Sequence, residues 1–90
     1  MRKKKTRPWF LYIVRCNDGT LYTGIALDPE IRIAAHNSGK GAKYTRCRLP
    51  VELVYLEKLP TQGEAMKREC NIKRLGKNRK EALILEAQER

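Results

Sequence analysis

Long hydrophobic runs are missing from this sequence of 90 residues. The longest apolar stretch is the six residues from Trp9 to Val14, whereas a helix that spans a bilayer needs about 18 to 20. The chain begins with basic residues, as a secretion signal does, but the apolar stretch that follows them is too short for one. These absences exclude a transmembrane protein, and we expect a cytoplasmic protein without a membrane partner.

Cysteine is scarce and has no metal-binding spacing. Cys16, Cys47 and Cys70 are an odd number and lie far apart, and the sequence contains neither a CxxC pair nor a His-x-x-x-His pair. Disulfide frameworks need paired cysteines, and zinc sites need closely spaced ligands. We therefore expect neither disulfides nor zinc.

Acidic residues are half as numerous as basic ones. Ten Asp and Glu accompany 20 Lys and Arg, which gives a formal net charge of +10, and the first 50 residues hold 11 of the basic residues but only 3 of the acidic ones. A basic face attracts polyanions by releasing their counterions, and nucleic acid is the most abundant polyanion of a cytoplasm. The composition alone leaves open an anionic membrane surface, or a basic protein without a polyanionic partner.

The chain is long enough for one domain only. Residues 1–8 are basic and polar, so we predict a flexible arm there and a single domain over residues 9–90. Residues 9–16 and 20–25 are rich in aromatic and β-branched side chains and flank a turn sequence, which predicts a β-hairpin. Residues 51–59 predict a third strand, inside the sheet or covered on both faces, because it is apolar on both sides.

Capping residues predict the starts of three helices. Each start combines a side chain that accepts a backbone N–H with a proline or glutamate shortly after it, at Asp28–Pro29, Thr61–Glu64 and Asn78–Glu81. The first helix is expected to end near residue 37, and Gly76 is expected to close the second. Residues 38–48, between the first helix and the third strand, predict a basic loop.

The length of the hairpin loop decides which side chains share a face of the sheet. We favour a three-residue loop with Gly19 in the left-handed region. Val14 then opposes Tyr22. Tyr12 opposes Gly24, so the two tyrosines become diagonal neighbours on one face. A two-residue loop would send the tyrosines to opposite faces.

Glu69 falls on an apolar side of its helix. On a helical projection it lies near the middle of an arc that also holds Ala65, Met66 and Ile72. A buried carboxylate needs a partner such as an arginine, a tyrosine or a metal ion. An ion pair with Lys73, one turn later, explains the glutamate equally well without any site. Both interpretations remain open.

These residues, in this order, resemble the GIY-YIG nuclease family. The first family motif corresponds to Phe10-Leu11-Tyr12 and the second to Tyr22-Thr23-Gly24. The helix arginine and histidine of the family correspond to Arg32 and His36, and its metal-binding glutamate corresponds to Glu69. Each short motif is weak evidence alone, but the complete ordered set is specific.

The resemblance covers about residues 9 to 84. The run from His36 to Arg46 is most similar to the small single-domain bacterial members of the YhbQ type. The family fold is α+β, with a small three-stranded, mainly antiparallel sheet flanked by helices. The order of elements predicted above agrees with that fold, and we expect three helices around the sheet.

The resemblance implies metal-dependent hydrolysis of a phosphodiester bond in nucleic acid, with DNA favoured over RNA. The implied process is DNA repair, recombination or the processing of branched or single-stranded DNA. A single Mg²⁺ or Mn²⁺ on Glu69 and the guanidinium of Arg32 would stabilise charge on the phosphate. Tyr12 would accept the proton of the attacking water, with Tyr22 and His36 orienting the water or relaying the proton. The nucleic-acid strand would be held by Lys40, Lys43, Tyr44 and Arg46.

The sequence departs from the family motifs at three positions. Phe10 and Leu11 replace the glycine and isoleucine of the first motif, and Thr23 replaces the isoleucine of the second. A phenylalanine in place of glycine can narrow access to the site. The alternative function is a non-catalytic basic nucleic-acid-binding module on the same scaffold, which has no need of Glu69. A small adaptor that docks a partner through Trp9 and the last helix is a third interpretation.

Overall fold

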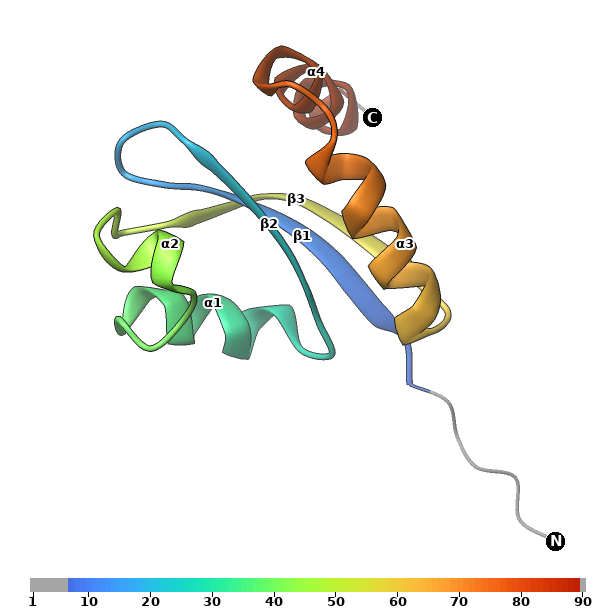
Figure 1. The fold of residues 1–90 in the computed structure, drawn as a ribbon, viewed down its shortest axis with the longest axis horizontal. Helices are drawn as coiled ribbons and strands as arrows, with labels where there is room; N and C mark the ends of the chain where they lie inside the picture. The colour runs from blue at the N-terminus through green and yellow to red at the C-terminus, as the bar shows by residue number, and fades with distance from the viewer. Residues whose placement is uncertain (1–6, 90) are drawn as a thin grey trace, which may run out of the picture.

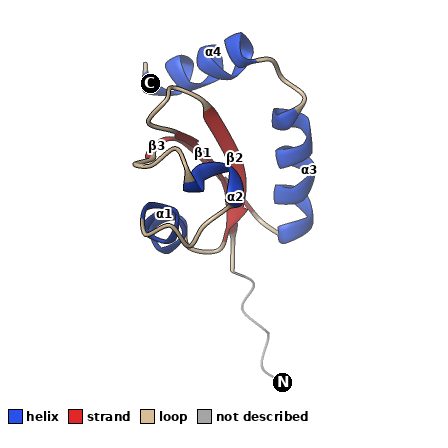
Figure 2. Ribbon diagram, turned by 60° about the vertical axis from the view of Figure 1, so that its left-hand side comes forward, coloured by secondary structure: helices blue, strands red, loops and turns tan. Residues whose placement is uncertain are grey.

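The computed structural model describes residues 7–89, so residues 1–6, most of the expected basic arm, lie outside the described part, as does residue 90. A three-stranded antiparallel sheet forms the centre, and helices cover both of its faces (Figure 1, Figure 2). This confirms the predicted α+β class. The elements in chain order are β1 (Trp9–Arg15), β2 (Leu21–Ala26), α1 (Pro29–Asn37), α2 (Lys43–Arg46), β3 (Glu52–Leu59), α3 (Gln62–Lys73) and α4 (Lys77–Gln88).

The β1–β2 hairpin has the predicted three-residue loop. The loop comprises residues 17–19, and Gly19 adopts a φ of 85°, which glycine reaches without a steric penalty. Tyr12 therefore opposes Gly24 and lies diagonally from Tyr22, as predicted. The loop thus places both motif tyrosines on one face of the sheet.

The two faces of the sheet carry separate clusters, because alternate residues of a strand point in opposite directions. The cluster on the α1 face contains Tyr12, Val14, Cys16, Ala26 and Val51, with Ile33 of α1 packed against it. The cluster on the α3 and α4 face contains Leu11, Ile13, Ile72 and Ile84. In the motif Phe10-Leu11-Tyr12, the leucine therefore serves one face and the tyrosine the other.

The prediction that the third strand lies inside the sheet was wrong. The strand order is β2-β1-β3, so β3 lies at an edge. Leu53 and Leu56, on its α1 side, are 39% and 46% exposed. Val54 and Tyr55, on its other side, pack into the α3 and α4 cluster. An apolar pattern on both faces of a strand does not reveal which face a short helix leaves uncovered.

The helices differ from prediction at two places. The basic loop 38–48 contains the short helix α2, so the described residues hold four helices rather than three. α3 ends at Lys73, and Gly76 is the N-cap of α4 rather than the end of α3. The other two starts are confirmed, because Asp28 and Thr61 each accept a hydrogen bond from the backbone N–H three residues later, at 3.2 and 3.1 Å.

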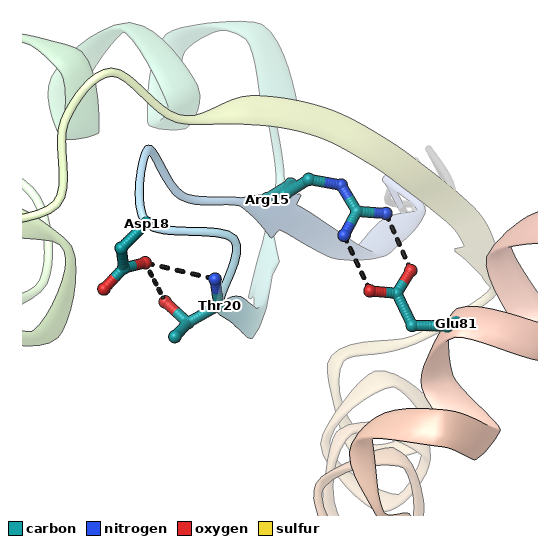
Figure 3. A network of polar contacts seen from close by, with 4 residues as sticks. All are labelled: Arg15, Asp18, Thr20 and Glu81. Carbon is teal, nitrogen blue, oxygen red and sulfur yellow. Dashed lines mark hydrogen bonds and ion pairs between the residues drawn. The ribbon is translucent and has the colours of Figure 1, made fainter.

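A two-point ion pair fastens α4 to the end of β1 (Figure 3). Arg15 donates from both of its terminal nitrogens to the two carboxylate oxygens of Glu81, each at 2.7 Å. Glu81 therefore does not cap a helix start as predicted. The guanidinium of Arg15 holds the pKa of the Glu81 carboxyl below its usual range. The pair sets the first turns of α4 beside the hairpin. None of the helices in the described part is long and apolar enough to cross a membrane.

Candidate active site

Tyr12 is the central side chain of the site, and only 1% of it is exposed. Its ring lies across Gly24 of the neighbouring strand. A Cβ on Gly24 would lie 2.5 Å from the Tyr12 hydroxyl oxygen and 2.6 Å from its Cζ. Only glycine leaves room for the ring at this distance. The tyrosine of the first motif and the glycine of the second are therefore a packed pair.

His36, near the end of α1, contacts the Tyr12 hydroxyl. Its imidazole is fully buried, and Nε2 lies 2.9 Å from the Tyr12 hydroxyl oxygen. The Ala42 N–H points at Nδ1 at 3.3 Å, and the Thr45 hydroxyl, which donates to the Ala42 carbonyl oxygen, lies 2.8 Å from the same nitrogen. The first contact needs a lone pair on Nδ1 and the second needs a proton, so the tautomer decides whether Nε2 donates to the Tyr12 oxygen or accepts from it. In either tautomer the imidazole is hydrogen-bonded to the Tyr12 hydroxyl.

Thr45 and Gly41 hold the imidazole in place, and the sequence analysis missed both. Thr45 is fully buried, and its hydroxyl lies 2.8 Å from His36 Nδ1 and 3.0 Å from the Ala42 carbonyl oxygen. A Cβ on Gly41 would overlap Nδ1 and Cα of His36. The signal was present, since a glycine and a threonine follow the histidine closely. The charge of residues 38–48 had indicated only a basic loop.

Burial raises the pKa of Tyr12 above its ordinary value of 10.0. The nearby Arg32 guanidinium lowers this pKa, while Tyr22 and the negative charge of Glu69 raise it further. The predicted role of Tyr12 as a proton acceptor requires a lowered pKa. The chain's own residues therefore do not supply the lowering that this role requires.

The pH dependence of stability tests the buried imidazole. His36 is the only histidine, and burial, followed by the charge of Arg32, lowers its pKa below 6.5. Below about pH 6.5 the unfolded chain binds a proton that the folded protein does not, so the free energy of unfolding falls as the pH falls through the folded pKa. Carboxylates with lowered pKa values, such as Glu81, change the free energy of unfolding only below about pH 4.5.

Urea unfolding between about pH 7 and pH 5 measures this effect, over the range in which histidine titrates. We expect a smaller free energy of unfolding at the acid end. A value that stays constant, or rises as the pH falls, would contradict a neutral buried imidazole. Replacing His36 with glutamine provides the control, because this variant lacks the titrating group and should lose the pH dependence.

Tyr22 of β2 packs against Tyr12 and His36, and together with Tyr44 these residues form what we call the tyrosine cluster. Its ring centroid lies 5.4 Å from that of His36 and 6.5 Å from that of Tyr12. Tyr44 of α2 stacks on Tyr22 at 5.8 Å, with 24° between the ring planes. The Arg48 guanidinium lies over the Tyr44 ring at 4.2 Å. Tyr44 is thus the predicted nucleic-acid-binding residue that the structure places against the site.

The other three predicted nucleic-acid-binding residues lie on the surface. Lys40, Lys43 and Arg46 are all exposed. Among the described residues, none of the three forms an ion pair with a carboxylate. Lys40 lies in the turn after α1, and the other two flank Tyr44 on α2. They leave a cationic surface around this side of the cluster.

Glu69 has features of both interpretations, the ion pair with Lys73 and a carboxylate directed at the site. Its carboxylate is 24% exposed and lies 3.3 Å from the Lys73 ammonium, one turn along α3. The same carboxylate is close enough to Tyr12 to raise the pKa of the phenol. The predicted apolar arc was wrong at Met66, which is 54% exposed. α3 packs on the sheet through a narrower stripe, whose buried residues are Ala65 and Ile72.

Two of the three departures from the family motifs face away from the two motif tyrosines. Leu11 and Thr23 face α3 and α4, and the buried Thr23 hydroxyl has no hydrogen-bond partner among the described residues. Phe10 lies on the same face as Tyr12, where it lines a cavity of about 410 Å³ with residues of β3 and the start of α1. The lining of that cavity includes none of the residues with a predicted catalytic or metal-binding role.

Among the described carboxylates, Glu69 is the one that acts on the Tyr12 phenol. Within residues 7–89, no group of three His, Cys, Asp or Glu side chains is placed to hold a metal ion. Mg²⁺ commonly binds through one or two carboxylates, keeps several waters and takes further oxygens from substrate phosphates. Glu69 by itself fits that mode of binding.

The family model of the GIY-YIG catalytic domain matches residues 8–82. This span runs from the start of β1 into α4 and contains the whole tyrosine cluster. The chain belongs to the GIY-YIG family, as the motif order indicated.

Its relatives include small proteins of similar length. A UPF0213 protein of Staphylococcus epidermidis is 56% identical over 77 residues, covering 86% of this chain and 94% of that protein. The UPF0213 protein of Staphylococcus saprophyticus is 54% identical over the same coverage. The chain is therefore similar to short members of the family over most of their length.

Two proteins solved by NMR in solution share the fold. The UPF0213 protein from Bacillus halodurans is 45% identical with a TM-score of 0.56, covering 86% of this chain and 82% of that one. A protein from E. faecalis is 38% identical with a TM-score of 0.63, covering 100% of this chain and 94% of that one. Both likenesses extend over most of each chain.

Proposed function

We propose that this protein is a metal-dependent endonuclease that hydrolyses phosphodiester bonds in nucleic acid, with DNA preferred to RNA. The observation that carries the proposal is the buried contact of Tyr12 with His36 at 2.9 Å, in reach of Arg32 and Glu69. A tyrosine that served packing alone would need neither an imidazole nor a guanidinium beside its hydroxyl. The GIY-YIG match supports the same activity.

The residues divide the chemistry between them. Tyr12, as the phenolate, accepts the proton of the attacking water. His36 contacts the Tyr12 hydroxyl through Nε2 and so fixes the position of the oxygen that takes the proton. Arg32 neutralises a nonbridging oxygen of the phosphate as negative charge develops. Tyr22, packed against His36, orients the water.

Glu69 would hold a single Mg²⁺ or Mn²⁺, completed by waters and the substrate phosphate. Bound there, the ion supplies positive charge to the phosphate and the leaving oxygen. Lys73 lies 3.3 Å from this carboxylate in the free protein, so its ammonium would compete with a metal ion for Glu69. The basic surface meets phosphates rather than base edges, which suits branched or single-stranded DNA of repair and recombination.

A non-catalytic nucleic-acid-binding module is the second candidate function. Two observations favour it. The Lys73 ammonium neutralises Glu69, and burial raises the pKa of Tyr12. In such a module, loss of Glu69 leaves binding intact or strengthens it by removing a negative charge.

Replacing Glu69 with glutamine separates the two functions. Wild type and variant are compared on labelled single-stranded, duplex, flap and four-way-junction DNA and on an RNA strand, each with Mg²⁺ or Mn²⁺. The nuclease proposal predicts that cleavage falls at least about 100-fold while binding is retained. Glu64→Gln is the matched control, because Glu64 is exposed at the start of the same helix, and it should cleave like wild type.

The other outcomes are equally informative. Salt-dependent binding without cleavage by wild type or control would replace the nuclease with the binding module. Equal cleavage by wild type and Glu69→Gln would remove the metal-binding role of this residue. Cleavage of the RNA strand alone would overturn the preference for DNA.

A further inference from the structure

A groove lies beside the tyrosine cluster, between the hairpin, α2 and the start of α4. Its volume is about 190 Å³. Thr20 and Leu21 of the hairpin, Tyr44 of α2, and Lys77 and Lys80 of α4 line it. Of these residues, only Tyr44 has a role in the function proposed above.

Tyr44 connects this groove to the candidate active site. Its ring stacks on Tyr22 at 5.8 Å, and Tyr22 in turn lies 5.4 Å from His36. Lys73, at the end of α3, lies over the Tyr22 ring at 6.0 Å. The junction of α3 and α4 therefore borders both places. A polymer that is bound at the tyrosine cluster can therefore extend past the hairpin into the groove.

The α3–α4 junction is strongly basic. Residues 67–80 hold seven basic residues and one acidic residue. The net charge of the second half of the chain does not reveal this stretch, because the remaining acidic residues of that half lie outside it. Lys77 and Lys80 are three apart and so share one side of α4. Of the described carboxylates, none forms an ion pair with either lysine, whereas Arg68 is paired with Glu57 at 3.0 Å.

The ion pair of Figure 3 holds these lysines at the groove. Glu81 follows Lys80 directly, but both of its carboxylate oxygens accept from Arg15 at 2.7 Å. This carboxylate is therefore engaged with β1, and the contact fixes the first turns of α4 against the hairpin. α4 also starts at Gly76 without a side-chain cap, so its end adds positive potential of the same sign.

We propose that this groove binds the phosphates of a nucleic-acid strand adjacent to the scissile bond, through Lys77 and Lys80. The inference rests on the proposed function and adds a binding site to it. The groove has a volume of about 190 Å³, and the two lysines line it. Neither ammonium forms an ion pair with a described carboxylate, so both offer donors to phosphate oxygens, which position a strand without reading its sequence. The groove would therefore hold the strand next to the cut.

Binding of labelled single-stranded DNA without a metal ion tests the groove. Lys77→Ala with Lys80→Ala is compared with Lys67→Ala with Arg79→Ala, which removes the same charge from exposed positions that do not line the groove. We expect the groove variant to bind about tenfold more weakly than the control variant. The slope of log affinity against log salt should fall by about 1.4, or roughly 0.7 for each lost phosphate contact.

A second measurement does not depend on any substitution. Titration of wild type with the same strand should shift the amide NMR signals of the groove residues more than those of β3. Equal losses of affinity in the two double variants, or shifts confined to the Lys40–Arg46 segment, would overturn the groove as a binding site. Thermal unfolding of both variants verifies that their folds are intact.

The outcomes distinguish this inference from the nuclease proposal. If wild type does not cleave, but the groove variant alone loses binding, the groove stands and the nuclease fails. If wild type cleaves, and the groove variant binds and cleaves like the control, the groove fails and the nuclease stands. Repeating the titration in the Glu69→Gln background keeps binding separate from turnover.

Discussion

Replacing Tyr12 with phenylalanine is expected to lower DNA cleavage by about 10²- to 10⁴-fold, the range typical of a lost general base. The variant keeps the ring that packs across Gly24 and loses only the hydroxyl that contacts His36 Nε2 at 2.9 Å. The buried His36 Nε2 then lacks its hydrogen-bond partner, which costs about 1 to 3 kcal/mol of stability. Gel-resolved cleavage of single-stranded and flap DNA measures the effect, and binding without metal should be unchanged.

Tyr55→Phe is the matched control. Tyr55 lies on β3, faces α3 and α4, and donates its hydroxyl to Glu57 at 2.8 Å, so it loses a comparable hydrogen bond away from the cluster. This variant should cleave like wild type. Undiminished cleavage by Tyr12→Phe would show that another group accepts the proton.

The wild-type rate should also rise with pH. Because burial raises the pKa of Tyr12, little phenolate is present at neutral pH. The cleavage rate is therefore expected to increase about tenfold per pH unit above pH 7, until the phenol titrates. A rate that is independent of pH above 7 would contradict Tyr12 as the proton acceptor.

Replacing Gly24 with alanine is expected to destabilise the protein by about 2 to 3 kcal/mol, from overpacking and a lost hydrogen bond. The new Cβ would lie 2.5 Å from the Tyr12 hydroxyl oxygen. The buried ring can move only by leaving His36. For a domain of this size, the melting temperature should fall by roughly 10 to 20 °C. Cleavage should fall with it, since Tyr12 no longer meets the imidazole.

Gly63→Ala controls for the change of glycine to alanine. A Cβ on Gly63 would meet only the Thr61 hydroxyl oxygen, at 3.9 Å. Gly63 lies in the first turn of α3, where alanine is the better helix former by up to about 1 kcal/mol. This variant should melt at or above the wild-type temperature. If Gly24→Ala has the same melting temperature as wild type, the Tyr12 ring has more room than the strand register indicates.

Local patterns predicted most of the secondary structure. Asp28 and Thr61 cap helices as expected, and Gly19 closes a three-residue loop, because caps and tight turns depend on neighbouring residues. The position of β3 could not be derived in this way. Exposure of Leu53 depends on how far α1 extends over the sheet, which is a property of the packed fold.

The residues that surround Tyr12 were also predictable, but their contacts were not. Motif order placed Tyr22, Arg32, His36 and Glu69 in one site, and the fold brings all four into the neighbourhood of Tyr12. The exact partner of each side chain depends on distances between elements far apart in the chain.

The sequence by itself determined the family, the α+β class and the hairpin register, because these follow from motif order, periodicity and turn residues. Only the tertiary structure showed that Thr45 holds His36, that Arg15 engages Glu81 across 66 positions, and that Lys77 joins Tyr44 in one groove. These contacts arise between elements whose relative placement is set by packing on the two faces of the sheet. Side-chain packing between distant elements leaves no periodic signal in a single sequence.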